Sequence, residues 1–170
     1  IHMYNLSVVF ITFFSINFSI LFFLFSANLN VGIFRVGADA TLAFVDSAKI
    51  NAPSGVNYLS STAQLLYQTP PVNRVATSNE FPATMPGSVM VSNGTVRLDT
   101  TTSIRNITIQ GALALKNSTL DFGKDSTRLR IEGAISFNPS QFNTNRTHSL
   151  TIAGSGSISG IINFTNNVIG

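Results

Sequence analysis

The chain has no cysteine and no tryptophan among its 170 residues, and few of its side chains are charged. The absence of cysteine excludes disulfide bonds, zinc sites built from thiolates and thiol nucleophiles. Charged residues make up 10% of the chain, and the formal net charge is +3. The Lys and Arg residues are scattered singly from Arg35 to Arg146. Because nucleic-acid-binding domains cluster such residues on one surface, we expect no nucleic-acid partner.

Charge is missing entirely from the N-terminal part of the chain, since positions 1–34 contain no Asp, Glu, Lys or Arg. Residues 8–27 form an apolar stretch long enough to cross a bilayer as a helix. A signal peptide is a second interpretation, although it normally begins with a positively charged region. A strand is the third, because apolar and polar residues alternate over residues 14–20. We therefore treat residues 1–30 as an apolar signal, anchor or assembly segment, with membrane contact through residues 8–27.

A short phrase occurs three times near the C-terminal end, and it predicts the fold. It reads ITIQGALAL from Ile107, LRIEGAISF from Leu129 and LTIAGSGSI from Leu150. The glycines at its centre are Gly111, Gly133 and Gly154, so the period is about 21–22 residues, within the range of stacked repeat units. Alternating apolar residues indicate strands, and the glycine indicates a sharp bend between two of them. A strand–bend–strand unit of this length is typical of one coil of a β-solenoid.

The rest of the chain is less regular, and we divide it by composition. Residues 31–67 form an N-terminal β part, which begins with a looser copy of the phrase around Gly37 and ends in residues 58–67, the only candidate for a short helix. Residues 68–88 contain four of the six prolines and are expected to be a loop. Residues 89–170 are the solenoid repeats. Asn93-Gly94 fits either the phrase or a hairpin turn, so antiparallel pairing stays open there.

The predicted fold is therefore all-β, a small β-solenoid or parallel β-helix with an apolar N-terminal segment. A β-sandwich with an N-terminal helix is the alternative. In a solenoid the alternating apolar residues point inward and stack on their counterparts one coil away. The predicted inner residues are Ile107, Ile109, Leu113, Leu115, Leu120, Phe122, Leu129, Ile131, Ile135, Phe137, Leu150, Ile152 and Ile158. The intervening Thr108, Gln110, Arg128, Arg130 and Glu132 are expected to face solvent.

Residues 89–160, with the line GTVRLDTTTSIRNITIQGALAL and the later LRIEGAISF, resemble glycine-punctuated β-helical modules of surface proteins. They are similar to bacterial autotransporter passenger repeats, and also to the eight-glycine domain of eukaryotic ciliary and hyaluronan-handling proteins. The resemblance implies a β-helical fold and a location at the cell surface. It implies no catalytic residue.

Few residues suggest a site. Five Asn-x-Ser/Thr sequons lie beyond the apolar segment and are candidates for N-glycosylation: Asn93, Asn106, Asn117, Asn145 and Asn163. Asp121 and Asp125 are too few ligands for a calcium loop. No nucleophile elbow, phosphate-binding glycine loop or dinucleotide fingerprint is present. We predict no catalytic residue, no metal ligand and no cofactor.

These observations favour a non-enzymatic structural protein, extracellular or at the cell surface, either secreted or membrane-anchored. The open ends of a solenoid are exposed sheet edges, so self-association into a filament, or a role as an adhesin subunit, is the leading hypothesis. A carbohydrate-binding or carbohydrate-processing module that contacts glycans is one alternative. An accessory subunit anchored through residues 8–27 is another.

Overall fold

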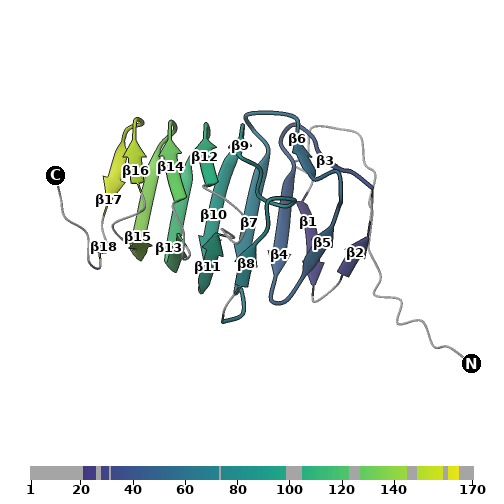
Figure 1. Ribbon diagram of the computed structural model, residues 1–170, viewed down its shortest axis with the longest axis horizontal. Coiled ribbons are helices and arrows are strands. Elements are labelled where there is room, and N and C mark those ends of the chain that lie inside the picture. Colours follow the sequence, from purple (N-terminus) through teal and green to yellow (C-terminus); the bar gives the residue numbers. More distant parts are fainter. Residues whose placement is uncertain are drawn as a thin grey trace, which may run out of the picture.

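The computed structural model describes residues 21–25, 28–30, 32–72, 74–98, 105–122, 127–144, 149–158 and 161–164. These residues form β-strands and no helix, and all strand pairs among them are parallel. The chain winds into a β-solenoid whose coils stack along the long axis of the molecule (Figure 1). The solenoid prediction is confirmed, and the β-sandwich alternative is wrong for the described residues.

One long sheet runs through the stack and receives a strand from each coil. Its strands, in order along the stack, are β1 (Leu21–Phe25), β4 (Thr41–Val45), β7 (Gln64–Gln68), β10 (Ser88–Ser92), β13 (Leu113–Asp121), β15 (Ile135–Thr144) and β17 (Gly156–Ile158). The long strands β13 and β15 continue around a corner. There they pair with β11 (Thr95–Leu98) and β18 (Ile161–Phe164), and β11 pairs in turn with β8 (Arg74–Ala76).

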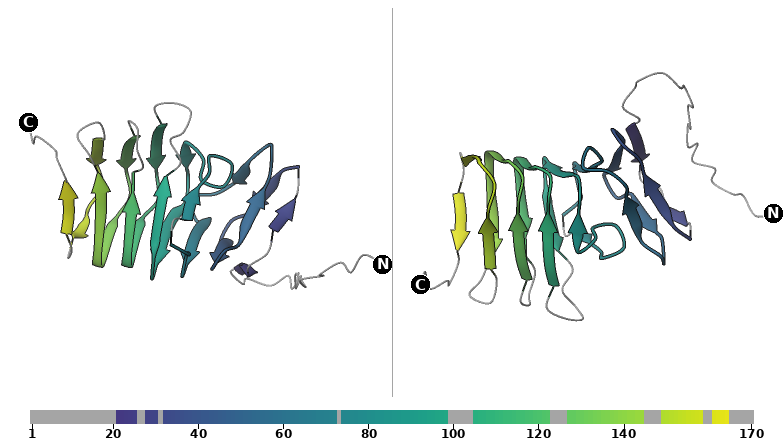
Figure 2. Two further views of the ribbon diagram at one scale, coloured as in Figure 1. Left: turned by 60° about the horizontal axis from the view of Figure 1, so that its bottom comes forward. Right: turned by 90° about the horizontal axis from the view of Figure 1, so that it is seen from above.

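Three smaller sheets complete the walls. The largest of them contains β9 (Thr84–Met85), β12 (Arg105–Ile109), β14 (Thr127–Ile131) and β16 (Ser149–Ile152). Near the N-terminal end, β2 (Asn28–Asn30) pairs with β5 (Lys49–Asn51), and β3 (Phe34–Val36) pairs with β6 (Val56–Tyr58). Figure 2 shows strands of successive coils side by side from two further directions.

The coil length varies along the stack. In the long sheet, Thr41 pairs with Gln64 and Gln64 with Ser88, so each of these middle coils contains about 23–24 residues. Further along, Leu113 pairs with Ile135 and Ile135 with Gly156, so each of these later coils contains about 21–22 residues. The predicted repeat length therefore describes the C-terminal coils, whereas the middle coils are longer.

Gly111, Gly133 and Gly154 lie one above another, as the solenoid prediction requires. A Cβ atom on Gly111 would collide with the backbone of Gly87, one on Gly133 with Gly111, and one on Gly154 with Gly133. Their backbone angles are not what selects glycine, because none of the three lies in the left-handed region. Close approach of neighbouring coils excludes a side chain at this corner. The column continues backward to Gly87 and then to Ala63.

The core is the column of inward-facing side chains, and the alternating pattern of the sequence predicted most of the C-terminal part of it. Ten of the thirteen predicted residues are buried: Ile107, Ile109, Leu113, Leu115, Leu120, Phe122, Leu129, Ile131, Ile135 and Phe137. Leu150 is partly buried against the core, Ile152 is 38% exposed, and the side chain of Ile158 lies outside the described part. The outward residues Gln110, Arg128, Arg130 and Glu132 are exposed as expected, and Thr108 is half-buried.

Three expectations for the middle of the chain are corrected. Residues 58–67 contain no helix but the end of β6 and most of β7. Asn93-Gly94 forms no hairpin, since β10 and β11 both pair with β13 in parallel. Gly94 also lies outside the glycine column, because it contacts Pro70. The expected proline-rich loop at 68–88 contributes the short strands β8 and β9 to the walls.

The apolar N-terminal segment is described only at its end. Residues 21–25 form β1, which pairs with β4, whereas residues 1–20 lie outside the described part of the chain. No helix long and apolar enough to cross a membrane occurs among the described residues. Residues 21–25 are therefore a strand and not the end of an anchor helix over residues 8–27, and the anchor, signal and strand interpretations stay predictions for the part of that segment outside the described residues.

Candidate functional site

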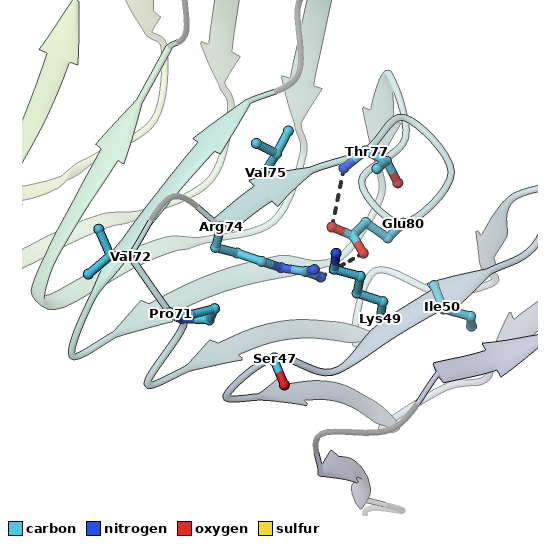
Figure 3. Close-up of a pocket in the computed structure, with 9 residues that line it drawn as sticks. All are labelled: Ser47, Lys49, Ile50, Pro71, Val72, Arg74, Val75, Thr77 and Glu80. Atoms are coloured by element: carbon cyan, nitrogen blue, oxygen red, sulfur yellow. Dashed lines mark hydrogen bonds and ion pairs between the residues drawn. The ribbon is translucent and has the colours of Figure 1, made fainter.

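A crevice with a volume of about 380 Å³ lies between two coils in the described part of the molecule (Figure 3). One side comes from the β4–β5 corner and β5, the other from the β7–β8 corner and β8. Residues after β8 close it. The lining residues are Ser47, Lys49, Ile50, Pro71, Val72, Arg74, Val75, Thr77 and Glu80.

The crevice lies where one wall of the solenoid is interrupted. β5 pairs with β2, and β8 pairs with β11, but β5 and β8 belong to different sheets. The corner before β8 carries Pro70 and Pro71, which have no N–H to donate to a neighbouring coil. In this wall, therefore, no strand pairing joins β5 to β8 among the described residues, although β4 and β7 of the same two coils are paired.

Arg74 forms the floor of the crevice and occupies a position that is otherwise apolar. It pairs with Val96 of β11, and Val96 pairs with Leu120 of β13, both of which are buried core residues. The Nη2 atom of Arg74 lies 2.8 Å from Oε2 of Glu80, and the two side chains are only 3% and 2% exposed. A buried guanidinium needs a partner, because removing an ion from water costs several kcal/mol unless an opposite charge compensates for it.

Two aromatic rings also lie close to the Arg74 guanidinium. Its central carbon lies 5.2 Å from the centroid of the Phe44 ring and 5.5 Å from that of Tyr67. These rings stack on each other with centroids 5.5 Å apart. The negative faces of the rings favour a cation at this distance. Among the buried side-chain polar atoms described, Nε of Arg74 alone has no hydrogen-bond partner.

Glu80 is held by several donors besides Arg74. The Tyr67 hydroxyl donates to its Oε1 at 3.3 Å, and the backbone N–H of Thr77 donates to the same atom at 3.2 Å. The Tyr58 hydroxyl donates to the backbone carbonyl of Glu80 at 3.0 Å. Burial raises the pKa of the Glu80 carboxyl, and Arg74 and the donors oppose this only in part. Burial also raises the pKa of Tyr58, and the charge of Glu80 adds to that effect.

Arg74 and Glu80 are therefore a buried ion pair with a structural role, and the side chains of the crevice that solvent can reach lie at its rim. Lys49 is exposed on β5 and forms no ion pair in the part of the chain that the structure describes. Val72 is 87% exposed at the opposite rim. An unpaired ammonium beside apolar side chains can bind an anionic group on an apolar body.

The candidate glycosylation residues Asn93, Asn106 and Asn117 do not line this crevice. Asn93, Asn106 and Asn117 are exposed, Asn145 lies outside the described residues, and Asn163 lies in β18 with its side chain outside the described part. Nδ2 of Asn117 donates to Oδ1 of Asn93 at 3.4 Å, since the two residues occupy the same corner of adjacent coils. Glycosylation of any of the five stays a prediction.

The corner of Asn93 and Asn117 is built from residues in the left-handed region. The column contains Asp46, Thr69, Asn93 and Asn117, with φ of 53°, 48°, 57° and 48°. The Thr69 hydroxyl donates to Oδ1 of Asp46 at 2.8 Å, so this pair bridges two coils as the two asparagines do. Asn and Asp tolerate this conformation better than most residues. The corner is a structural ladder, and it shares no residue with the crevice.

Sequence reasoning missed the crevice and its charged cluster. Arg74 and Glu80 lie in the stretch expected to be a loop, and only the register with Val96 shows that Arg74 faces inward. No group of three His, Asp or Glu side chains that could hold a metal ion occurs among the described residues.

No protein-family model, curated protein or solved structure matches the chain. The resemblance to autotransporter passengers and eight-glycine domains therefore stays a prediction.

Proposed function

We propose that the protein is a non-enzymatic structural protein whose solenoids associate end to end, at the cell surface or outside the cell. The observation that carries this proposal is the partial exposure of the core column at its last described position, Ile152. Ile152 pairs with Ile131, which pairs with Ile109, and these two are fully buried whereas Ile152 is 38% exposed. An inward column that ends in an exposed isoleucine favours a further apolar layer above it.

The strands at this end also present edges. β16 and β17 each pair on one side only among the described residues, with β14 and β15 respectively. The row of N–H and C=O groups on an unpaired edge is a template for another strand. Association through these edges would extend the sheets and would cover Ile152 at the same time.

A second copy of the chain suits this end because the coil lengths match. At the C-terminal end Arg128 pairs with Ser149 and Ile135 with Gly156, so the last coil contains about 21 residues. At the N-terminal end Leu21 pairs with Thr41 and Asn28 with Lys49, so the first described coil contains about 20–21 residues. The middle coils are longer than both. A head-to-tail contact between unlike ends is heterologous, and it generates a filament when the rotation between successive copies does not close into a ring.

The experiment is to measure assembly of the full chain with Ile152→Asp and with Thr151→Asp. Thr151 is the matched control, because it is the adjacent exposed residue of β16 and lies outside the buried column. We expect the unmodified chain and Thr151→Asp to form oligomers or fibres in light scattering and negative-stain images, and Ile152→Asp to remain monomeric. A monomeric unmodified chain at about 100 µM would contradict the proposal.

The proposed location rests on separate features. The charge-free residues 1–34 and the exposed sequons at Asn106 and Asn117 are consistent with passage through a secretory route. Cell fractionation with glycosidase treatment tests this part. A deglycosylation shift and a surface fraction are expected, and recovery in the cytosol without glycan would overturn the location but leave the assembly proposal standing.

A further inference from the structure

The outer face of the long sheet carries a row of apolar side chains that crosses β4, β7, β10 and β13. In the register of this sheet Ala43, Leu66, Met90 and Ala114 are neighbours on successive strands. They point outward, because the residues immediately before and after each of them belong to the inner core. We call these four residues the outer row. The inner core does not need them, so their apolar character has to be explained in another way.

The outer row is covered near β1 and becomes exposed further along the sheet. Ala43 is fully buried although it does not belong to the inner core, and Val45 on the same face is buried as well. Leu66 is half-buried, and Met90 is 41% exposed. The outer face of β7 and β10 therefore leaves apolar area in water, and burying that area would be favourable.

The side chains beside the outer row carry no charge. The other outward positions described on the same three strands are Thr41, Val45, Gln64, Gln68, Ser88 and Ser92. The outer face of β14 contains two arginines instead, Arg128 and Arg130. An uncharged apolar segment can therefore pack on β4, β7 and β10 without removing an ion from water, which would be costly.

The segment that precedes β1 has the matching chemistry. Residues 14–20 read FSINFSI, so apolar side chains alternate with small or polar ones, and residues 1–34 contain no charged side chain. Because residues 21–25 form β1, the apolar stretch before it is residues 8–20. As a helix these residues would span roughly 20 Å, which is less than the about 30 Å of a bilayer core. The apolar side of this segment is therefore better matched to a protein surface than to a bilayer.

The outer row is also within reach of this segment. Leu21, the first residue of β1, pairs with Thr41 at the end of the long sheet. Three strand spacings separate β1 from β10, a distance of about 14 Å. Residues 14–20 in an extended conformation would span about 23 Å. They can therefore cross β4 and β7 and bring Ile16 close to Met90.

We propose that residues 14–20 of the chain pack against the outer face of the long sheet and cover Leu66 and Met90. The apolar side chains of the segment lie on the outer row, and Ser15, Asn17 and Ser19 face solvent. This contact uses the outer face of one wall and not the ends of the stack. It is therefore independent of the end-to-end association proposed above.

Disulfide cross-linking tests the contact in the full chain, which has no cysteine of its own. One variant carries Ile16→Cys and Met90→Cys. The matched control carries Ile16→Cys and Arg128→Cys, because Arg128 is exposed on the outer face of β14, in a different sheet. The variants are oxidised at about 1 µM protein, so that reaction within one chain dominates. We expect the 16–90 disulfide to form at least about tenfold faster than the 16–128 disulfide, as measured by non-reducing gels and mass spectrometry.

Methionine oxidation supplies a second readout, with the fully buried Met85 as internal reference. In dilute peroxide Met90 should oxidise slowly in the unmodified chain. Phe18→Asp should raise that rate about tenfold, whereas Ser19→Asp, on the polar side of the segment, should not change it.

Three results would overturn the proposal: equal rates for the two disulfides, disulfides formed only between chains, or a Met90 oxidation rate that Phe18→Asp leaves unchanged. Absence of the 16–90 disulfide together with flotation of the chain on phosphatidylcholine vesicles would also overturn it, and would assign the segment to a lipid surface.

Discussion

The backbone of Gly133 lies directly against the backbone of Gly111 in the preceding coil, so that no side chain fits between them. We expect Gly133→Ala to force the two coils apart and to destabilise the fold by about 2 kcal/mol or more. Gly37→Ala is the control, because a Cβ atom there would meet nothing within 4 Å. Denaturant unfolding of both variants measures the difference, and equal losses would contradict the close-approach explanation.

The Arg74–Glu80 pair should behave as a buried pair rather than as a surface one. We expect Arg74→Met to lower the free energy of unfolding by about 3–5 kcal/mol, because it leaves the Glu80 carboxylate buried without its cation. The double variant Arg74→Met, Glu80→Met should recover much of this loss. Arg130→Met, which breaks the exposed pair with Glu132, should cost about 1 kcal/mol or less. A double-mutant cycle by urea unfolding provides the comparison, and additive losses at Arg74 and Glu80 would contradict the coupling.

The pH dependence of stability should reflect the raised pKa of Glu80. Burial raises this pKa from its ordinary value of 4.5, so the folded state prefers the protonated carboxyl. The corresponding contribution to stability is fully present below pH 4.5 and is lost as the pH rises through the folded-state pKa. We therefore expect the stability of the unmodified chain, measured relative to Glu80→Gln, to decrease as the pH rises above 4.5. Unfolding titrations at several pH values test the sign, and a relative stability that increases with pH would show that Arg74 dominates over burial.

The left-handed corner predicts an unusual order of substitutions at Asn117, whose φ is 48°. Asn117→Gly loses only the hydrogen bond to Asn93, whereas Asn117→Ala also places a Cβ in a disfavoured conformation. We expect the alanine variant to be less stable than the glycine variant by about 1 kcal/mol. Thermal and urea unfolding measure the order, and an alanine variant as stable as the glycine variant would contradict the strained-corner interpretation.

The C-terminal coils could be predicted because their sequence repeats what the structure requires. Gly111, Gly133 and Gly154 are in register, and alternating apolar residues on either side of them form the core. A Cβ atom at any of these three positions would collide with the preceding coil, so this packing constraint can be recognised in the sequence as a repeated glycine. Ile152, which the pattern predicts to be buried, is partly exposed, because its exposure depends on its place in the last described coil and not on the alternation of apolar residues.

The N-terminal coils could not be predicted because their corners differ in length. Met85 precedes the column residue Gly87 by two positions, whereas Tyr58 precedes Ala63 by five. The extra residues break the spacing of the repeated motif, and alanine stands where the later coils have the glycine that indicates the corner. Residues 58–67 therefore show no clear strand pattern. Arg74 is a further departure, because a charged residue at an inward position is only recognisable once Val96 is known to lie beside it.

Each coil of the solenoid contacts mainly the coils before and after it, since every strand pairs with the equivalent strand one coil away. In such an architecture the change in the free energy of folding on adding one coil comes from that coil and its contacts with its two neighbours. A duplication of residues 112–133, which would insert one whole coil between two that already fit each other, lengthens the molecule without disturbing either terminus. The length of the solenoid can therefore change during evolution in steps of one coil, each by duplication of a short segment of the gene.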